Sequence, residues 1–448
     1  MHILKRLENN NRKNNLVISN KLSLNLRGIK KYQNKISNFL KYCAGKKVAL
    51  IISDDFILAE WLILLDGLSS RISIIPSNLS PLATRDLVDS SSSEMILTNY
   101  DIKIEYKNIY KISDAESNIY ADLRYDYKTE WAISTSGTTR KPRLVIHDLQ
   151  RLMSATKEIK NKDNFVWGLL YGMQRFAGIQ VFLQSIFNSS LFIPNLSNNL
   201  NFIVNQFLDN SINCLSASPT LWRKLLMSPK FTELQMRVIT LGGEIADQNI
   251  LNALKKNFKD AKIRHIYAST EAGVGFSVTD GLAGFPKKYL EKNHNNFNLK
   301  ISNKNTLLIR SDAIATKYAD SNLNFKDEDG FIDTDDLIKT KGDRCVFLGR
   351  KNGTINIGGN KIHPEMIENV LISFEGVKLA KVYSKKSSII GGILICDLVI
   401  DNKITDTDKF TQKIKIFCSK KIDNFMIPNI IKYVKNIELT STGKISRL

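Results

Sequence analysis

The segment that most constrains this chain runs from Ser134 to Arg143 and reads STSGTTRKPR. Hydroxyl side chains surround Gly137, which lets main-chain amides approach an anion closely, and Lys141 and Arg143 add positive charge. An apolar stretch precedes the segment and a helix-like stretch follows it, so the pattern is typical of a loop around a polyphosphate. No Gly-Lys-Ser/Thr tripeptide closes it, which excludes a Walker A loop. A Ser/Thr-rich surface turn is the alternative interpretation.

The bulk composition indicates a soluble globular protein. Of the 448 residues, 43% are hydrophobic and 24% are charged, and the length predicts about three structural units. No stretch is long enough to cross a bilayer, and the N-terminus lacks the apolar run of a secretory signal. We therefore expect a cytoplasmic enzyme without a membrane span.

The net charge of +20 makes nucleic acid a partner to consider. The lysines, however, are spread along the whole chain, and no module combines aromatic and basic residues. Phosphate-rich small molecules or an acidic carrier protein explain a basic surface equally well. We predict no nucleic-acid partner.

Cysteines and histidines show no metal-binding or disulfide pattern. The five histidines are dispersed, and the five cysteines are scattered at positions 43, 214, 345, 396 and 418. We expect reduced and mostly buried thiols, and no transition-metal site built by the protein.

Alternating segments in the N-terminal part predict an α/β fold with largely parallel sheets. Lys46–Ser53 and Arg71–Pro76 have the composition of buried strands, and Phe56–Leu68 between them is predicted to be an amphipathic helix. Leu191–Pro194 and Val238–Leu241 continue the pattern as strands.

The residue composition and pattern change near Gly349, where a Gly/Asn-rich turn begins. A compact α+β unit is predicted to follow, with a helix from Pro364, strands at Val377–Tyr383 and Ile389–Ile400, and a helix at Phe410–Lys421.

Four further motifs follow the first in order: YASTE (267–271), TDDL (334–337), LGRKNGTINIGGNKIHP (348–364) and STGKISR (441–447). The ordered set resembles the adenylate-forming superfamily, which comprises acyl-CoA synthetases, aryl-acid ligases and the adenylation domains of peptide synthetases. The resemblance extends from the first motif to the last residue. It is weak before Trp131, where the chain looks shorter than is usual.

The resemblance implies a large multi-subdomain N-terminal domain (1–350) that binds ATP and an acid, and a small mobile C-terminal domain (351–448) with a hinge at 351–353. It also implies an AMP-forming ligase that needs ATP and Mg²⁺. Such an enzyme converts a carboxylic acid to an acyl-adenylate, releases pyrophosphate, and passes the acyl group to a thiol. The thiol would be CoA or the phosphopantetheine of a separate acyl or peptidyl carrier protein.

By the same resemblance, Tyr267 would stack on adenine, Thr270 would bond the α-phosphate and Glu271 would hold Mg²⁺. Asp336 and Arg350 would reach the ribose hydroxyls. The remaining nucleotide contacts would come from the phosphate loop and a glycine pair, namely Thr135, Ser136, Gly137, Thr138, Thr139, Lys141, Gly243 and Glu244.

Lys444 matches the lysine that bridges the incoming carboxylate and the α-phosphate. A flexible ammonium on a mobile domain suits this transient role. Gly358, Gly359 and Lys361 match the loop that acts in thioester formation.

Three positions depart from the family pattern. Arg140 stands where relatives usually have glycine, and there it supplies another phosphate contact unless the position needs a positive φ. Asp335 also replaces a common glycine, and the hinge residue is Asn352 where Asp or Lys is usual.

The segment 171–180 is expected to floor the acyl pocket, through Gln174, Arg175 and Gly178 together with Gly242. Amino-acid-activating relatives place an aspartate here to pair with the substrate ammonium. A buried cation instead favours a polar or anionic acid, so an α-amino acid is disfavoured.

Two alternatives stay open. The sequence Gly242-Gly243-Glu244 favours an amino-acid-activating adenylation protein. Arg140, Asp335 and Asn352 are compatible with a nucleotide-binding relative that has lost catalysis, although the retained Glu271 and Lys444 argue against this. The sequence leaves the acid and the thiol acceptor open.

Overall fold

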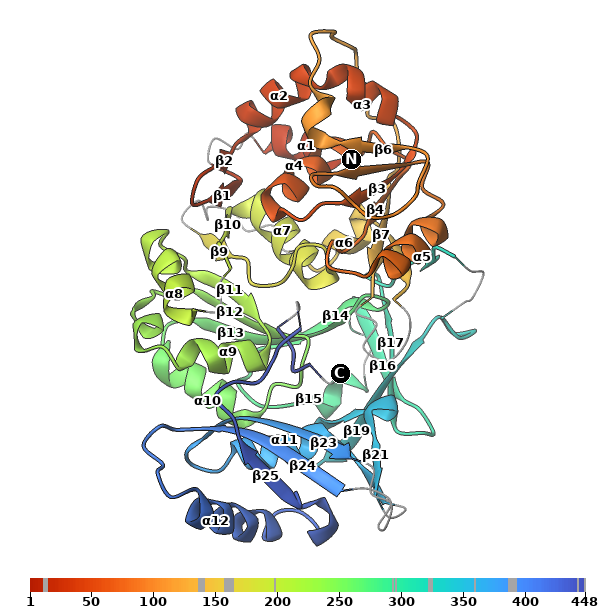
Figure 1. The fold of residues 1–448 in the computed structure, drawn as a ribbon. Coiled ribbons are helices and arrows are strands. Elements are labelled where there is room, and N and C mark those ends of the chain that lie inside the picture. The colour runs from red at the N-terminus through yellow and green to blue at the C-terminus, as the bar shows by residue number, and fades with distance from the viewer. Residues whose placement is uncertain are drawn as a thin grey trace.

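A computed structural model describes residues 1–10, 15–135, 142–156, 165–196, 199–291, 294, 296–320, 325–357, 360–385, 393–440 and 443–446. In Figure 1 the chain runs from the N-terminal part at the top, through a middle layer, to a C-terminal unit at the bottom. The tail after that unit turns back to the middle of the molecule (Figure 1).

The N-terminal part is built on a seven-stranded sheet in the order β18-β8-β7-β4-β3-β5-β6. The strands from β7 to β6 are parallel, whereas β8 pairs antiparallel with both β7 and β18. Its strands are β3 (Lys47–Ile51), β4 (Arg71–Ile74), β5 (Met95–Thr98), β6 (Ile109–Lys111), β7 (Glu130–Ser134), β8 (Leu144–Asp148) and β18 (Lys317–Tyr318). The accompanying helices are α1 (Ile3–Asn9), α2 (Leu26–Lys35), α3 (Ser37–Cys43), α4 (Asp55–Leu65), α5 (Pro81–Ser91) and α6 (Leu149–Met153).

An eight-stranded sheet forms the middle layer, in the order β14-β13-β12-β11-β9-β10-β1-β2. Only the edge strands β14 and β2 pair antiparallel with their neighbours. The strands are β1 (Val17–Ser19), β2 (Ser23–Leu24), β9 (Val166–Gly168), β10 (Ser190–Ile193), β11 (Cys214–Ala217), β12 (Val238–Gly242), β13 (Lys262–Ser269) and β14 (Gly273–Val278). Four helices connect them: α7 (Phe176–Asn188), α8 (Leu200–Asp209), α9 (Pro219–Leu226) and α10 (Gln248–Asn257).

A five-stranded antiparallel sheet, β15-β20-β19-β17-β16, carries the chain toward the C-terminal unit. Its strands are β15 (Phe285–Pro286), β16 (Phe297–Ile301), β17 (Thr306–Ser311), β19 (Ile332–Lys341) and β20 (Arg344–Arg350).

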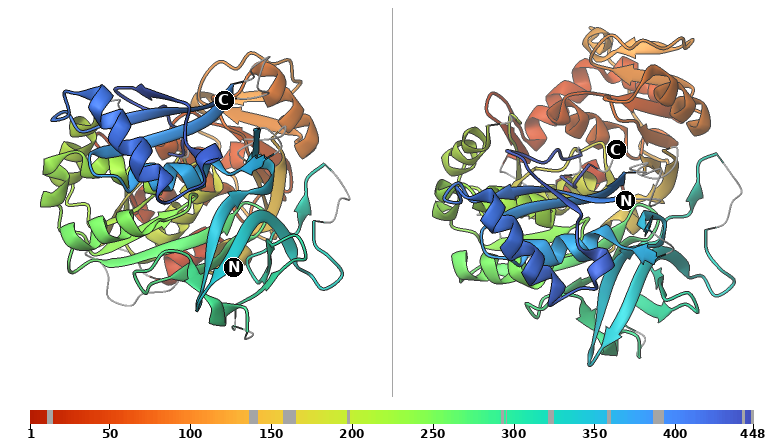
Figure 2. Two further views of the ribbon diagram at one scale, coloured as in Figure 1. Left: turned by 90° about the horizontal axis from the view of Figure 1, so that it is seen from below. Right: turned by 60° about the horizontal axis from the view of Figure 1, so that its bottom comes forward.

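The C-terminal unit has a hydrophobic core of its own, which includes Ile367, Leu398 and Ile414. Figure 2 shows this unit, in blue, beside the green helices of the middle layer. Its elements are β21 (Ile355–Ile357), β22 (Asn360–Ile362), α11 (Pro364–Ile372), β23 (Val377–Lys385), β24 (Ile393–Ile400), α12 (Thr407–Ser419) and β25 (Ile430–Tyr433).

The predicted α/β class is confirmed, and so are the predicted strands within the described residues. The expectation that the segment after Ser53 forms an amphipathic helix was wrong. Helix α4 buries Phe56, Leu58, Trp61 and five further residues, because α1, α2, α3 and β1 all contact it. All five cysteines are free and buried, as expected. Within the described part of the chain, no helix combines the length and apolarity needed to span a membrane.

Asp66, at the C-terminal end of α4, ties the N-terminus to the seven-stranded sheet. Its carboxylate accepts hydrogen bonds from Ile3 N at 2.8 Å and from Trp131 Nε1 at 2.9 Å. The side chain is buried, and this burial raises the pKa of Asp66. A buried acceptor with two donors is costly to remove, because both donors then lack partners.

We predict that Asp66→Ala lowers the free energy of unfolding by about 2–5 kcal/mol. The matched control is Asp101→Ala, since the Asp101 side chain is 87% exposed and forms an ion pair with Lys111 at the surface. The control should cost less than about 1 kcal/mol. Equal urea midpoints for the two variants would contradict the structural role of Asp66.

Candidate active site

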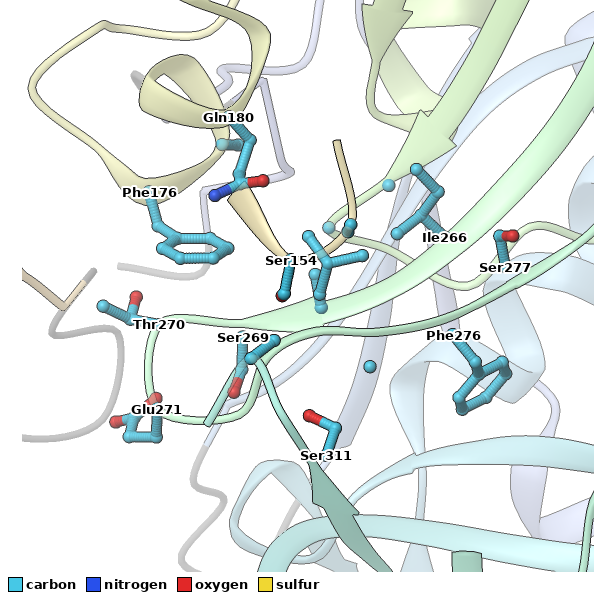
Figure 3. A pocket seen from close by; sticks show the side chains of 18 of the residues that line it. Ser154, Phe176, Gln180, Ile266, Ser269, Thr270, Glu271, Phe276, Ser277 and Ser311 are labelled. Atoms are coloured by element: carbon cyan, nitrogen blue, oxygen red, sulfur yellow. The ribbon is translucent and has the colours of Figure 1, made fainter. Parts of the chain in front are cut away.

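A cavity of about 1680 Å³ lies where the sheets and the C-terminal tail meet. Many of the predicted site residues line it, although they come from distant parts of the chain. These are Thr135, Arg175, Gly242, Gly243, Thr270, Glu271, Arg350 and Lys444. Figure 3 shows Thr270 and Glu271 at the turn between β13 and β14, below Phe176 and Gln180 of α7.

The segment expected to bind phosphate begins at the end of β7, in agreement with the apolar stretch that precedes it. The expectation of a helix-like stretch after it was wrong, because Leu144–Asp148 forms β8 and pairs with β7. Ser136, Gly137, Thr138, Thr139, Arg140 and Lys141 lie outside the described residues. The two ends of the segment are joined, because Thr135 N donates to Arg143 O at 2.8 Å and Arg143 N donates to Thr135 Oγ1 at 3.1 Å. Arg175 holds the start of the segment, because its Nη1 donates to Ser134 Oγ at 3.2 Å and to Thr135 O at 2.9 Å.

Asp336 on β19 and Arg350 on β20 form an ion pair and are Cα partners in the ladder between these strands. Arg350 Nε lies 3.2 Å from Asp336 Oδ1, and the hydroxyl of Tyr267 donates to Asp336 Oδ2 at 2.5 Å. Burial, followed by the charge of Asp336, raises the pKa of Tyr267. The structure therefore brings the three predicted nucleoside-binding residues into direct contact.

Asp335 adopts the left-handed backbone conformation, with φ of +57°. This explains why glycine is common at the position, and why aspartate is a tolerable replacement: Asp visits this region more readily than most residues. The amide of Asp335 donates to Asp333 Oδ1 at 3.0 Å, which holds the turn.

The ring of Tyr267 lies parallel to two phenylalanines that the sequence reasoning missed. Its centroid is 5.3 Å from those of Phe276 and Phe347, with interplanar angles of 14° and 5°. An adenine that stacks on Tyr267 would compete with these rings, so this role stays a prediction. In the sequence, only the alternation of side chains between the two faces of β13, β14 and β20 could have indicated that Tyr267, Phe276 and Phe347 form a cluster.

His147, on β8, is a second residue that the sequence reasoning missed. It is 1% exposed, and its Nε2 donates to the carbonyl oxygen of Thr270 at 2.7 Å. Burial lowers the pKa of His147 to about 4, so the ring is neutral at neutral pH. Ala315 N donates to Glu271 O at 3.0 Å, so both residues of the Thr270–Glu271 turn are held through their carbonyls.

Lys444 enters the cavity from the C-terminal tail. A Cβ on Gly243 would lie 3.0 Å from Lys444 Cε and 3.7 Å from Nζ, and Gly243 itself has φ of +83°. Glycine is therefore required at 243 both by the backbone and by the close approach of Lys444. Burial, with a further contribution from Arg350, lowers the pKa of Lys444.

The carboxylate of Glu244 holds this tail in place. Oε1 accepts from Ile445 N at 3.1 Å, and Oε2 accepts from Thr220 N, in the first turn of α9, at 3.0 Å. Ser218 Oγ, the N-cap of the same helix, donates to Gly443 O. Glu244 thus joins the residue after Lys444 to the start of α9.

The predicted acyl-pocket residues divide into two groups. Arg175 and Gly242 line the cavity. Gln174 faces the seven-stranded sheet, where it bonds Ile52 O and Ser77. Gly178 packs against the backbone of 172–173, which leaves no room for a side chain.

The predicted thioester loop falls largely outside the described part of the chain. Gly358 and Gly359 belong to the undescribed residues, and the backbone of Lys361 lies in β22. Their roles stay predictions.

Comparisons with known proteins agree with these features. Residues 131–298 match the sequence profile of the family described as AMP-binding enzyme. D-alanine--D-alanyl carrier protein ligase of Staphylococcus aureus (strain Newman) is 24% identical over 402 residues, which cover 84% of this chain and 81% of that protein.

Two solved structures share the fold over nearly the whole chain. One is the anthranilate CoA ligase AuaEII with anthranoyl-AMP (TM-score 0.81, 15% identity, 100% of this chain and 96% of that chain). The other is o-succinylbenzoate CoA synthetase from Bacillus subtilis with OSB-AMP (TM-score 0.75, 15% identity, 99% and 96%). The predicted fold and the resemblance to adenylate-forming enzymes are confirmed.

The shifted pKa of His147 predicts a pH dependence of stability. Its folded pKa of about 4 lies below the ordinary 6.5, so the unfolded chain binds one more proton between these values. Stability therefore falls as the pH drops from 6.5 to 4, by about 3 kcal/mol from this residue. His147→Gln retains a donor for Thr270 O but does not titrate. We expect the free energy of unfolding of this variant to lose the part of its decrease between pH 6.5 and pH 4 that His147 causes. An unchanged pH profile would contradict the assignment.

Proposed function

We propose that this chain, an AMP-binding enzyme with the adenylate-forming fold, activates a carboxylic acid with ATP and transfers the acyl group to a thiol. The observation that carries the proposal is the position of Lys444, which the tail places over Gly243 in a cavity with Thr270, Glu271 and Arg350. A lysine delivered to this point can neutralise charge on a carboxylate and a phosphate at once. It can also leave when the tail moves.

In the first half-reaction, an oxygen of the substrate carboxylate attacks the α-phosphorus of ATP. The bond to the bridging oxygen breaks, and pyrophosphate leaves with that electron pair. Lys444 and the Thr270 hydroxyl would stabilise the negative charge on the reacting oxygens. The two joined ends of the phosphate loop, together with the side chains of Arg175 and Arg143, would hold the β- and γ-phosphates.

The nucleoside would lie along the Asp336–Arg350 pair. Each oxygen of Asp336 already accepts one hydrogen bond, and a carboxylate oxygen can accept another from a ribose hydroxyl. Glu271 would hold Mg²⁺, since its carboxylate lines the cavity beside the Thr270 hydroxyl and oxygen donors suit this cation. Bound Mg²⁺ would neutralise charge on the phosphate oxygens.

In the second half-reaction, a thiolate attacks the acyl carbon and AMP leaves. We propose that residues 1–350 and 351–448 act as two domains, and that the second turns about 351–353 to withdraw Lys444 and bring in the loop of Gly358, Gly359 and Lys361. The thiol would belong to CoA or to a carrier protein. The similarity to a carrier protein ligase supports the carrier.

A degenerate nucleotide-binding relative is the second candidate, motivated by Arg140 and Asn352. The arrangement around Lys444 speaks against it, since five hydrogen-bonding groups on Glu244, Ser218, Thr220, Gly443 and Ile445 serve to place one ammonium. Asp335 no longer supports this candidate, because its backbone conformation suits aspartate.

We predict that Lys444→Ala lowers carboxylate-dependent pyrophosphate release from Mg-ATP by at least about 100-fold, while ATP binding changes little. The measurement uses a panel of short, aromatic, hydroxylated, dicarboxylic and amino acids. Lys435→Ala, an exposed lysine nearby in the chain, is the control and should retain full activity. Unchanged turnover of the Lys444 variant would refute the proposal.

Glu244→Ala separates the two half-reactions. If Glu244 acts by holding the tail, adenylate formation should slow by about 10-fold with an unchanged Kd for ATP, because one charge-assisted hydrogen bond to the tail is lost. Thioester formation from a supplied acyl-adenylate should keep its rate. A raised Kd for ATP would instead assign Glu244 to nucleotide binding.

A further inference from the structure

The far end of the cavity is built around one arginine. Alternate residues of β13, namely Lys262, Arg264, Ile266 and Ala268, face the cavity together with Thr240 and Gly242 of β12. Arg264 is the Cα partner of Thr240, and its Nε donates to Thr240 Oγ1 at 3.3 Å. Figure 3 shows Ile266 away from Thr270 and Glu271 along β13. Arg264 precedes Ile266 by two residues in the same strand.

Arg264 has no acidic partner among the residues that the structure describes. Its side chain is mostly covered, and burial lowers its pKa. The described carboxylates that line the cavity come from β8, from β19 and from the segments after β13 and β17: Asp148, Asp333, Asp335, Glu271 and Asp312. None of them comes from β13 itself or from its neighbours β12 and β14. A desolvated guanidinium is costly without an anion, so the site favours an anionic ligand.

The two cations define the ends of a binding space. Lys444 lies over Gly243, whereas the guanidinium of Arg264 lies at Thr240. Thr240 and Gly243 are three residues apart along β12 and its end, so their Cα atoms are separated by roughly 10 Å. Ile266, the Cα partner of Gly242, lies between these points along the strand pair, and Phe176 and Val181 of α7 add further apolar groups to the cavity lining. The space suits an acid with an apolar spacer between two charged ends.

We infer that the substrate carries a second anionic group, held by Arg264, and is therefore a dicarboxylic acid or an acid with an equivalent distal anion. This inference rests on the proposed function and narrows its substrate class. The reacting carboxylate would lie beside Lys444, and the distal anion would accept two hydrogen bonds from the guanidinium. An α-amino acid that lacks a distal anion is disfavoured, because it would leave the guanidinium of Arg264 without an anionic partner.

The test compares matched acids in the pyrophosphate-release assay. Linear diacids of four to eight carbons are paired with monoacids of equal length, aryl diacids with the corresponding monoacids, and amino acids are included. We expect kcat/KM for the best diacid to exceed that of its monoacid by about 10- to 100-fold, the range for one charge-assisted bidentate contact.

Arg264→Met should lower kcat/KM for the diacid by about the same factor and leave the monoacid unchanged or improved. Arg264→Lys should restore part of the diacid activity, since it keeps the charge but loses the planar fork. The control is Arg237→Met, an exposed arginine just before β12, which should change neither. Thermal melting of each variant identifies any loss of folding.

The possible results test the inference about the substrate and the proposed function separately. A wild-type preference for monoacids or amino acids, or equal losses for diacid and monoacid in Arg264→Met, would overturn this inference and leave the proposed function intact. Absence of release with every acid would overturn the proposed function, and the inference with it.

Discussion

The hydrogen bonds made by Glu244 are the constraint on which the rest of the site depends. One oxygen accepts from Thr220 N at the start of α9, and the other accepts from Ile445 N in the C-terminal tail. The residue between Gly443 and Ile445 is Lys444, so holding the backbone on both sides directs its side chain over Gly243. The contacts are few and peripheral to the C-terminal core, which suits a tail that must dock in one step and release in the next.

The architecture explains why the site forms where it does. Strands β7, β12 and β13 end at the cavity, and Thr135, the Gly242–Gly243 pair and the Thr270–Glu271 turn lie at or just after their carboxyl ends. Ligands of parallel α/β sheets bind at such carboxyl ends, because the loops there come from rigid strands. Buried His147 reinforces this rigidity by holding the carbonyl of Thr270.

Sequence motifs predicted the fold and eight of the residues that line the cavity, since each motif is local and carries its own backbone requirement. The contacts that complete the site are not local. His147 meets Thr270 across 123 positions, and Glu244 meets Ile445 across 201, so no spacing in the sequence signals either pair. Helix α4 was misjudged for a related reason: its apolar faces are covered by segments distant in the chain.

The central claim is that a carboxylate attacks the α-phosphorus of ATP in the cavity below Lys444. The most direct measurement uses an acid labelled with oxygen-18 in its carboxyl group, followed by mass spectrometry of the nucleotide product after transfer to a thiol. The account predicts AMP that carries one labelled oxygen, because the bridging oxygen of the acyl-adenylate comes from the acid. Unlabelled AMP, or ADP with labelled phosphate, would contradict it.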